Sequence, residues 1–530
     1  MGEEKPLTQQ TVPVHPQHSK LSPIKEKVNL NALSSQYEGT GTADDPFVVQ
    51  WIHGEMQNPL LWKDWYKWFI ALSMASTTLC VSFCSSAYSG GISGIKEDLG
   101  ASHELATLGL SLFVLGFGLG PLIWAPLSEM YGRRIVFFVT FGALTCFNVG
   151  TAVAPNIETI VVLRLLGGTF GSSPFTNAGG VIADIFNTRE RGLAMCIFAA
   201  APFMGPVIGP LIGGFLGETE GWRWIQGLMA IFSGFVWIFI SLAVPETYSP
   251  VLLKRRAAEL SRLTGKVYRS EAEVNRKTAT LKDALYTNLS RPWVLLFREP
   301  IVFLLSFYMA VIYGTLYMLF AAYPIVYQQH RGWSAGVAGL PFIGVAVGML
   351  GAVAYCIWVD NPRYLRVVDE HEGSAPPEAR LPPSLLGAIA LPIGLFMFAW
   401  TNGPSLPWAP SVIAGAPFGF AMLVVFLSIM NYLVDSYTIY AASVLAANSV
   451  FRAIFGAVFP LFTRQMYSAL GIHWASTIPA FLALICLPFP FLFYRFGERI
   501  RRKCKYSAIA AASVATQQKI SSVREPSRTV

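Results

Sequence analysis

Long apolar stretches alternate with short polar turns along most of the chain. Each stretch holds roughly 20 mostly apolar residues, enough to cross the ~30 Å hydrocarbon layer of a membrane as a helix. The pattern predicts twelve such helices, in two groups of six parted by a polar segment from Pro245 to Glu299. They are expected at residues 66–91, 104–126, 135–154, 158–184, 191–216, 222–244, 300–328, 333–359, 384–402, 407–433, 438–468 and 474–495.

The composition supports an all-α membrane protein. Hydrophobic residues make up 53% of the chain and charged residues only 13%, which excludes a soluble globular protein. Backbone polar groups must be paired within each span in lipid, and continuous apolar runs are not the alternating pattern of a barrel strand. The expected organisation is a disordered tail at 1–64, a six-helix bundle at 65–244, a central loop at 245–299, a second bundle at 300–495 and a basic tail at 496–530.

Basic residues predict the orientation in the membrane. Arginine and lysine gather in the turns after the second, fourth, sixth and eighth spans and in the C-terminal tail. Because cytoplasmic loops carry this excess, both termini are expected to be cytoplasmic. The net charge of +8 then reflects membrane topology, and no nucleic-acid partner is expected. The polar residues contain no zinc-binding spacing, nucleotide-phosphate loop or nucleophile constellation, so we expect no enzyme activity, cofactor, metal or catalytic residue.

The turn after the second span is expected to form a latch. It contains Glu129, Gly132, Arg133 and Arg134, and Asp184 lies at the cytoplasmic end of the fourth span. Glycine permits a tight turn, and the guanidinium groups can pair with either carboxylate. A proton on a carboxylate would weaken such a latch. The simpler interpretation is an anchor of positive charge at the membrane surface.

The fifth span carries glycines and prolines at regular spacing, namely Gly205, Pro206, Gly209, Pro210, Gly213 and Gly214. A helix face without side chains lets another helix approach closely, and prolines favour a bendable segment. A comparable strip of small residues occurs in the eighth span, at Gly344, Gly348 and Ala352. We expect these two helices to meet across the boundary between the two bundles. Ordinary close packing is the alternative.

A central site is expected from polar and aromatic residues at mid-depth. Tyr313, Tyr317 and Phe320 share one stripe of the seventh span, and the other candidates are Tyr88, Asn448 and Arg452. Aromatic stripes also occur in plain packing, but tyrosine hydroxyls in lipid need partners. No acidic residue lies deep in a predicted span, whereas Arg164 and Arg452 do. Each arginine either bonds helix carbonyls or, for Arg452, meets an anionic or carbonyl-rich substrate.

These motifs resemble the major facilitator superfamily, and within it the fungal twelve-span drug:proton antiporters, which include multidrug, polyamine and secondary-metabolite exporters. The resemblance runs from about residue 45 to residue 500. It lies in the turn from Pro126 to Arg134, where Pro126 replaces the usual glycine and Glu129 the usual aspartate, and in residues 205–214, which resemble the antiporter motif. It also includes Arg164, with Gly167 at a place often held by glutamine, and the run from Pro245 to Tyr248.

The resemblance implies a rocker-switch carrier that exports a small molecule in exchange for protons, with Arg164 and Asp184 in proton coupling. A monomer in the plasma membrane is expected, although a vacuolar membrane would leave the same sequence pattern. The alternatives are a facilitator or proton symporter that imports a nutrient, and a polyamine exporter, which would require buried carboxylates. A membrane enzyme or sensor would require a catalytic constellation or a large receptor tail.

Overall fold

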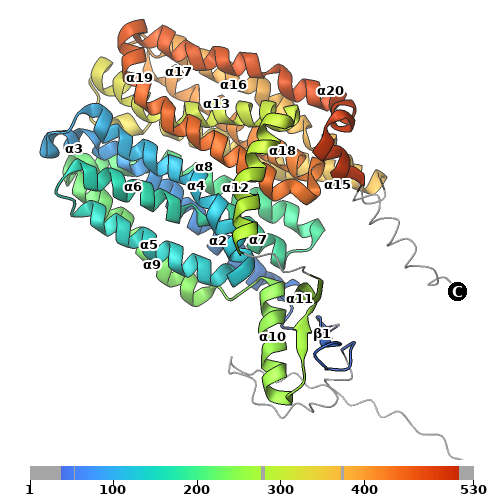
Figure 1. The fold of residues 1–530 in the computed structure, drawn as a ribbon. Helices are drawn as coiled ribbons and strands as arrows, with labels where there is room; N and C mark the ends of the chain where they lie inside the picture. The colour runs from blue at the N-terminus through green and yellow to red at the C-terminus, as the bar shows by residue number, and fades with distance from the viewer. Residues whose placement is uncertain (1–36, 53, 276–280, 372–374, 513–530) are drawn as a thin grey trace, which may run out of the picture. The chain divides into compact units, whose positions relative to one another are not determined.

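The computed structural model describes residues 37–52, 54–275, 281–371 and 375–512. By contacts the chain divides into a small unit, Met1–Gln50 with Leu253–Asn275, and a large unit, Trp51–Leu252 with Arg276–Val530. Within the large unit, the long helices lie side by side (Figure 1). The predicted tail segments 1–36 and 513–530 lie outside the described residues.

The small unit holds a two-stranded parallel sheet. β1 (Phe47–Val49) pairs with β2 (Tyr268–Ser270), so that Phe47 stands opposite Tyr268, and α11 (Glu271–Asn275) follows. The rings of Phe47 and Tyr268 lie 5.0 Å apart and both side chains are buried. The expectation of disorder up to residue 64 is therefore wrong for this segment. Its partner strand lies more than two hundred positions along the chain, which a local pattern does not reveal.

The first half of the large unit contains the helices that precede the central segment. They are η1 (Pro59–Leu61), α2 (Asp64–Ser86), η2 (Ala87–Gly91), α3 (Ile92–Leu99), α4 (His103–Tyr131), α5 (Arg133–Ala152), α6 (Ile157–Gly171), α7 (Ser173–Ile185), α8 (Thr188–Thr219) and α9 (Trp222–Ala243). In the central segment, α10 (Ser249–Thr264) belongs mostly to the small unit and α12 (Leu281–Arg298) to the large unit.

The second half contains the remaining helices. They are α13 (Pro300–Tyr323), η3 (Pro324–His330), η4 (Val337–Gly339), α14 (Phe342–Tyr355), η5 (Cys356–Asp360), α15 (Asn361–Glu370), η6 (Pro377–Arg380), α16 (Pro382–Thr401), α17 (Trp408–Ile413), α18 (Gly415–Ser436), η7 (Thr438–Tyr440), α19 (Ala441–Cys486) and α20 (Pro488–Lys503). Of these, η3 and η5 are π-helical turns.

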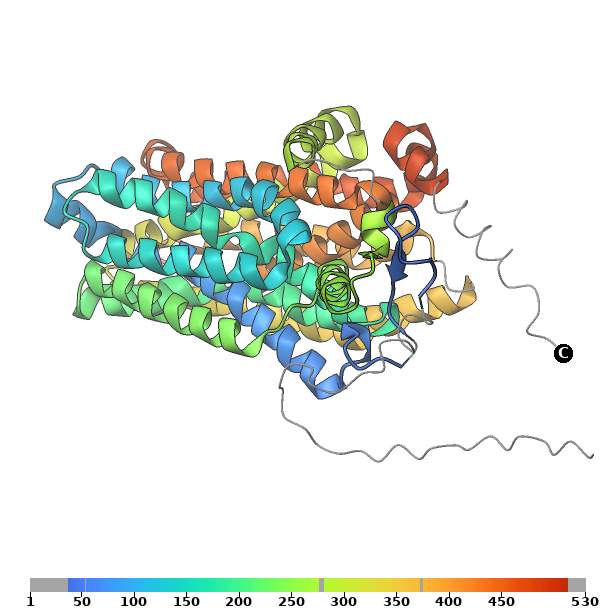
Figure 2. The same ribbon diagram turned by 60° about the horizontal axis from the view of Figure 1, so that its bottom comes forward.

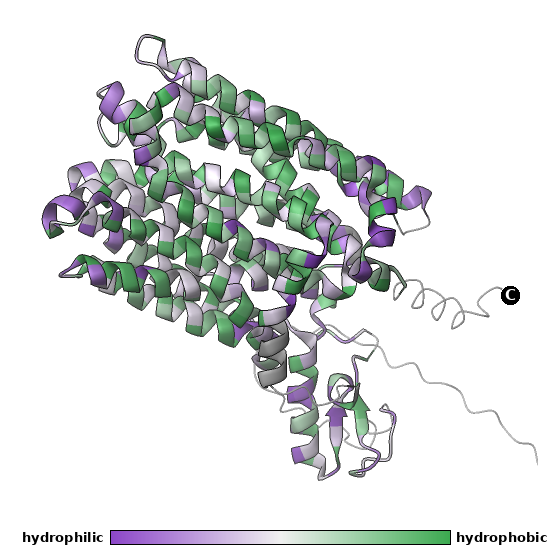
Figure 3. Cartoon of the chain, turned by 45° about the horizontal axis from the view of Figure 1, so that its top comes forward, coloured by the Kyte–Doolittle hydropathy of each residue, from purple (hydrophilic) through white to green (hydrophobic). Residues whose placement is uncertain are grey.

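The helices confirm the all-α membrane class. Ten helical segments in the described residues are long and apolar enough to cross a membrane. Figure 3 shows hydrophobic residues along the helices and hydrophilic ones gathered toward their ends. The predicted fourth span is broken at Ser172 into α6 and α7, and the segment 438–503 bends at Gly471, whose φ of 73° is non-helical. Division at this bend would separate the predicted eleventh and twelfth spans. The count of twelve and the cytoplasmic termini remain predictions.

The two halves touch through α4 and α19 and through α8 with α14 and η4. A side-chain carbon at Gly118 would lie 2.9 Å from the Ala453 Cβ, so α4 and α19 approach closely because this position has no side chain. We call the end of the bundle that carries Arg133, Arg134 and Arg501 the basic end, and the other end the opposite end. At the opposite end, the Gly336 N–H donates to the Glu218 carboxylate at 2.9 Å and ties the halves together.

Candidate functional site

Arg164 of α6 is buried, with 1% of its surface exposed. Its guanidinium donates to the backbone oxygens of Cys84 at 2.8 Å, Ser85 at 3.1 Å and Gly109 at 3.2 Å. Two of these acceptors lie in the last turn of α2, where the helix dipole places negative partial charge. No carboxylate in the described part of the chain pairs with Arg164. Helix carbonyls therefore stabilise its charge.

Two aromatic rings complete the surroundings of Arg164. The guanidinium carbon lies 4.5 Å from the ring centroid of Tyr88 and 4.1 Å from that of Phe113. Such contacts stabilise a desolvated cation by roughly 2 kcal/mol. The Tyr88 hydroxyl donates to the Ala106 carbonyl at 2.9 Å. Tyr88, predicted as a substrate residue, thus packs against Arg164 and connects η2 to α4.

A hydrogen-bonded chain leads from this arginine into the second half. Ser85, whose carbonyl Arg164 binds, places its Oγ 2.8 Å from the Tyr317 hydroxyl of α13. The Tyr313 hydroxyl donates to that of Tyr317 at 3.5 Å. The side chains of Ser85, Tyr317 and Tyr313 are all buried. The bond from Ser85 to Tyr317 thus joins the two halves in the protein interior.

Arg452 of α19 lies next to Tyr313, the last residue of this hydrogen-bonded series. Its guanidinium carbon is 4.8 Å from the Tyr313 ring centroid and 4.9 Å from that of Phe426. In the part of the chain that is described, no carboxylate pairs with it. It borders a small cavity of about 10 Å³ between the halves, whose other walls are Phe203, Met309, Ile312, Tyr313, Met422 and Phe426. This volume holds about one water molecule, so the structure has a closed centre.

The other predicted pocket residues, Asn448 and Phe320, do not line this cavity but contact residues near it. Asn448 donates through Nδ2 to the Ser306 Oγ and to the Met309 sulfur, both at 3.2 Å, and so ties α19 to α13. The Phe320 ring packs 5.1 Å from Tyr317. Sequence analysis missed Ser85 and five cavity residues: Phe203, Met309, Ile312, Met422 and Phe426. The sequence of an apolar span does not show which of its residues line a cavity and which face lipid.

The turn between α4 and α5 forms a charged cluster at the basic end. The Arg133 Nε lies 3.4 Å from an oxygen of Asp184, as the latch hypothesis expects. The backbone N–H groups of Arg133 and Arg134 donate to Glu246 at 2.9 and 3.2 Å. Glu246, which was not predicted, is buried and accepts from these backbone N–H groups, whereas Asp184 contacts the guanidinium group. The side chain of Glu129 is exposed and has no ion pair with any described residue.

The geometry of this turn requires glycine at position 132. Its φ is 102°, and a side-chain carbon there would collide with the Glu246 carboxylate. The Thr247 and Tyr248 N–H groups also donate to Glu246, at 3.1 and 3.0 Å. All bonds in this cluster lie within the first half and the first residues of the central segment, and none reaches the second half. Its effect on the closure of the two halves therefore remains a prediction.

The glycine strip of α8 faces its own half. Side-chain carbons at Gly205 and Gly209 would lie 2.6 and 2.7 Å from the backbone nitrogens of Phe83 and Ala87, and one at Gly213 would collide with the Ala87 carbonyl. The strip thus lets α8 pack closely against α2 and η2. Because Pro206 and Pro210 lie in this same helix, they interrupt its backbone bonding beside the α2 contact.

The helices α8 and α14 do contact each other across the two halves, as predicted, but their glycine strips do not form this contact. Gly344 and Gly348 instead face the backbone carbonyls of Val412 and Ala416, in α17 and α18. Small-residue strips specify close approach but not the partner, and each helix here uses its strip on a neighbour in its own half. Another face of α8 does reach the second half. A side-chain carbon at Gly214 would lie 2.7 Å from the Ala335 carbonyl.

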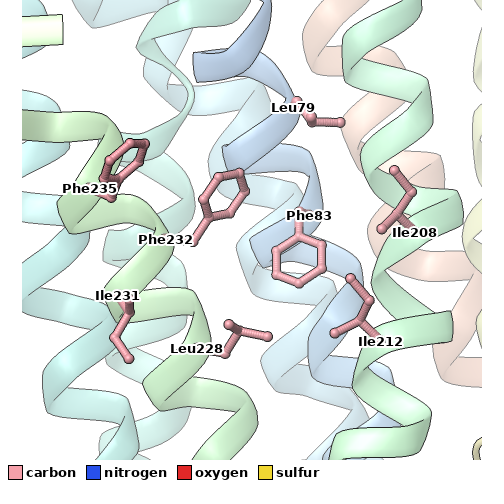
Figure 4. A pocket seen from close by; sticks show the side chains of 8 residues that line it. All are labelled: Leu79, Phe83, Ile208, Ile212, Leu228, Ile231, Phe232 and Phe235. Carbon is pink, nitrogen blue, oxygen red and sulfur yellow. The ribbon is translucent and has the colours of Figure 1, made fainter. Parts of the chain in front are cut away.

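A larger cavity, of about 450 Å³, lies among α2, α8 and α9 (Figure 4). All eight side chains that line it are apolar: Leu79, Phe83, Ile208, Ile212, Leu228, Ile231, Phe232 and Phe235. Ile231 and Phe235 are about two-thirds exposed in the isolated chain, at 65% and 66%. A groove of this composition on the outer surface of a membrane helix bundle suits lipid chains. It offers no polar group to orient a substrate.

Comparison with known proteins decides the family. Residues 74–460 match the sequence profile of the Major Facilitator Superfamily. The chain belongs to the major facilitator superfamily. It is therefore a multi-pass membrane transporter of small molecules rather than an enzyme.

Fungal members of the superfamily are similar over most of this chain. The major facilitator superfamily multidrug transporter mdrA of Aspergillus fumigatus is 61% identical over 472 residues, covering 89% of this chain and 78% of the relative. The MFS-type efflux pump MFS2 of Trichophyton rubrum is 60% identical over 485 residues, covering 92% and 81%. The major facilitator-type transporter sorT of Penicillium rubens is 51% identical over 485 residues, covering 91% and 92%.

A solved structure shows the same fold. The major facilitator proton:xylose symporter XylE, bound to 6-bromo-6-deoxy-D-glucose, aligns with a TM-score of 0.59 at 16% sequence identity. The alignment covers 82% of this chain and 96% of XylE. At this identity the likeness establishes the major facilitator fold alone.

Proposed function

We propose that this transporter is an efflux carrier that exports drug-like compounds or secondary metabolites in exchange for protons. The observation that carries the proposal is the pair of arginines linked across the halves, Arg164 through Ser85 and Tyr317 to Tyr313 and Arg452. Groups shared between two bundles respond to their relative movement, as alternating access requires. The names of the fungal relatives, a multidrug transporter and an efflux pump, support the outward direction.

The proposed substrate is an amphiphile with an apolar or aromatic body and one anionic or carbonyl group. Arg452 supplies a cation at a cavity whose other walls are aromatic, aliphatic or methionine side chains. Methionine adapts to irregular shapes and suits a site that accepts several compounds. A polyamine would bring its own positive charges toward Arg452, and none of the cavity's wall residues is acidic.

Proton coupling is proposed to act through Arg164 and Asp184. A proton on Asp184 would remove its charge and weaken the contact with Arg133, which would loosen the turn between α4 and α5. Arg164, held by helix carbonyls, would respond to any change at the Ser85 bond. We further propose twelve spans in two six-helix bundles, cytoplasmic termini, a monomer and a plasma-membrane location.

The closed centre defines the movement that transport needs. A cavity of about 10 Å³ must widen to admit an organic molecule, because known small-molecule sites occupy roughly 300–1,000 Å³. Opening at the opposite end would break the bond between Glu218 and Gly336. Opening at either end would strain the bond between Ser85 and Tyr317.

Purified protein in liposomes tests the proposal. An acidic lumen should drive uptake of a labelled aromatic acid or neutral amphiphile, and a protonophore should abolish this uptake. An alkaline lumen with acid outside would instead drive uptake by a proton symporter. Uptake under that gradient alone, or no dependence on any pH difference, would refute antiport.

A further inference from the structure

A separate cavity, of about 520 Å³, lies at the basic end of the second half and shares no wall residue with the central cavity. It lies between the junction of α12 with α13 and the C-terminal end of α20. Four of its wall residues are basic and exposed: Arg298, Arg499, Lys503 and Lys505. None of the four forms an ion pair with another residue in the described ranges. The cavity therefore combines a concave shape with positive charge that has no acidic partner there.

The one acidic wall residue is already engaged. Glu299 is 1% exposed, and its Oε2 accepts a hydrogen bond from the Tyr437 hydroxyl at 2.9 Å. Its Oε1 accepts from the backbone N–H of Tyr506 at 3.1 Å. These bonds hold the chain after α20 against the start of α13. Glu299 thus shapes the wall, while the four basic side chains keep an excess of positive charge.

The neighbouring helix α12 indicates that this cavity lies at the membrane surface. Its residues Pro292, Leu295 and Leu296 are buried, whereas Leu289, Trp293 and Phe297 form an exposed apolar stripe at a spacing of four. Phe297, next to the cavity residue Arg298, is 70% exposed. The helix runs across the direction of the spans (Figures 1 and 2). Exposed aromatic side chains on such a helix are typical of the boundary between headgroups and lipid chains.

We propose that this cavity binds the phosphorylated headgroup of an anionic phospholipid from the leaflet at the basic end. The cations of α20 and the segment after it would contact the phosphate oxygens, with Arg298 closing the site from the α12 side. The acyl chains would lie against the exposed stripe of α12 beside Phe297. Basic cavities between membrane helices are suited to lipids of this kind, and each basic residue contributes about 1 kcal/mol.

The test uses the full chain, purified in an uncharged detergent. Native mass spectrometry would measure binding of a short-chain phosphatidylinositol phosphate, a short-chain phosphatidylcholine and inorganic phosphate. The double variant Arg499→Gln with Lys503→Gln should bind the phosphoinositide roughly 30-fold more weakly, because two contacts of about 1 kcal/mol each are removed. The control double variant Arg495→Gln with Arg502→Gln removes the same charge from the same helix outside the cavity. It should change the affinity less than about threefold.

Each outcome decides the proposal. A loss at least threefold greater in the cavity variant than in the control supports a specific lipid site. Equal losses indicate attraction to surface charge alone and overturn it. Equal affinity for phosphatidylcholine, or inorganic phosphate binding as tightly as the short-chain phosphoinositide, also overturns it. If the double variant does not yield dispersed protein, the single variants Lys503→Gln and Lys505→Gln repeat the comparison, each with an expected loss of about fivefold.

Discussion

The Ser85 side chain of α2 and the Tyr317 side chain of α13 share a hydrogen bond of 2.8 Å between two buried hydroxyl groups. The two residues lie in different halves, 232 positions apart in the chain. Ser85 also supplies the carbonyl that accepts a bond from Arg164. Movement of the halves therefore acts directly on the surroundings of a buried cation.

The variants Ser85→Ala and Tyr317→Phe test this relationship. Each should destabilise the closed state by about 1–2 kcal/mol, since each removes the bond between the two hydroxyls and one further bond, from Ser85 to the Ser82 carbonyl or from Tyr313 to Tyr317. The loss in the double variant should fall short of the sum of the single losses by about 1 kcal/mol, because the bond between the two hydroxyls is counted in both. Thermal unfolding in detergent gives the stability, and transport in liposomes gives the rate. Additive losses would mean that the two hydroxyls act independently.

Arg452 should control the affinity for acidic substrates. Arg452→Gln should lower transport of an aromatic acid at least about tenfold, since a charge-assisted contact contributes about 1.5–3 kcal/mol. Transport of a neutral amphiphile should fall much less. Arg452→Lys keeps the charge but loses the planar contact with Tyr313 and Phe426, and should give an intermediate result. Uptake by proteoliposomes checks these rates, and Arg464→Gln, at an exposed position on the same helix, is the matched control.

Glu246 should stabilise the turn between α4 and α5, and Glu129 should not. Glu246→Gln replaces one acceptor oxygen by an amide donor that faces backbone N–H groups, at a cost of about 1.5–3 kcal/mol. Glu129→Gln changes an exposed side chain and should stay within about 0.5 kcal/mol. Melting temperatures in detergent compare the two variants. An equal shift in both would contradict the assignment of Glu246.

The glycine strip of α8 predicts a sharp difference between two substitutions. Gly209→Ala forces a methyl group onto the Ser86 hydroxyl and within 2.7 Å of the Ala87 nitrogen, and should cost about 1–3 kcal/mol. Gly351→Ala, in α14, meets no atom within 4 Å and should be neutral or stabilising by up to about 1 kcal/mol. The yield of dispersed protein and its melting temperature provide the measurement. Tolerance of Gly209→Ala would mean that α2 and α8 separate easily.

Hydrophobic patterning predicted most helices because each span satisfies its own backbone and needs only length and apolar character. It failed for β1, whose hydrogen bonds come from β2. It also did not anticipate the break at Ser172, because the apolar run continues across it. Motifs located the turn around Gly132 and named Glu129 or Asp184 as the carboxylate that pairs with its arginines, and Asp184 makes this contact. They did not name Glu246, which is distant in the chain and reaches the backbone N–H groups of the turn only in the fold.

Residue types alone were enough to predict a helical membrane transporter, two arginines within the spans and an aromatic stripe in the seventh span. They were enough because lipid admits few backbone structures and makes an unpaired charge costly. Which groups meet was settled by folding: Ser85 with Tyr317, Arg164 with helix carbonyls, and the α8 glycines with α2. Each of these contacts joins segments that are distant in the chain. Many other residues have the same type and the same spacing, so the local sequence does not identify the partner. Only the packing of all the helices together selects one of them.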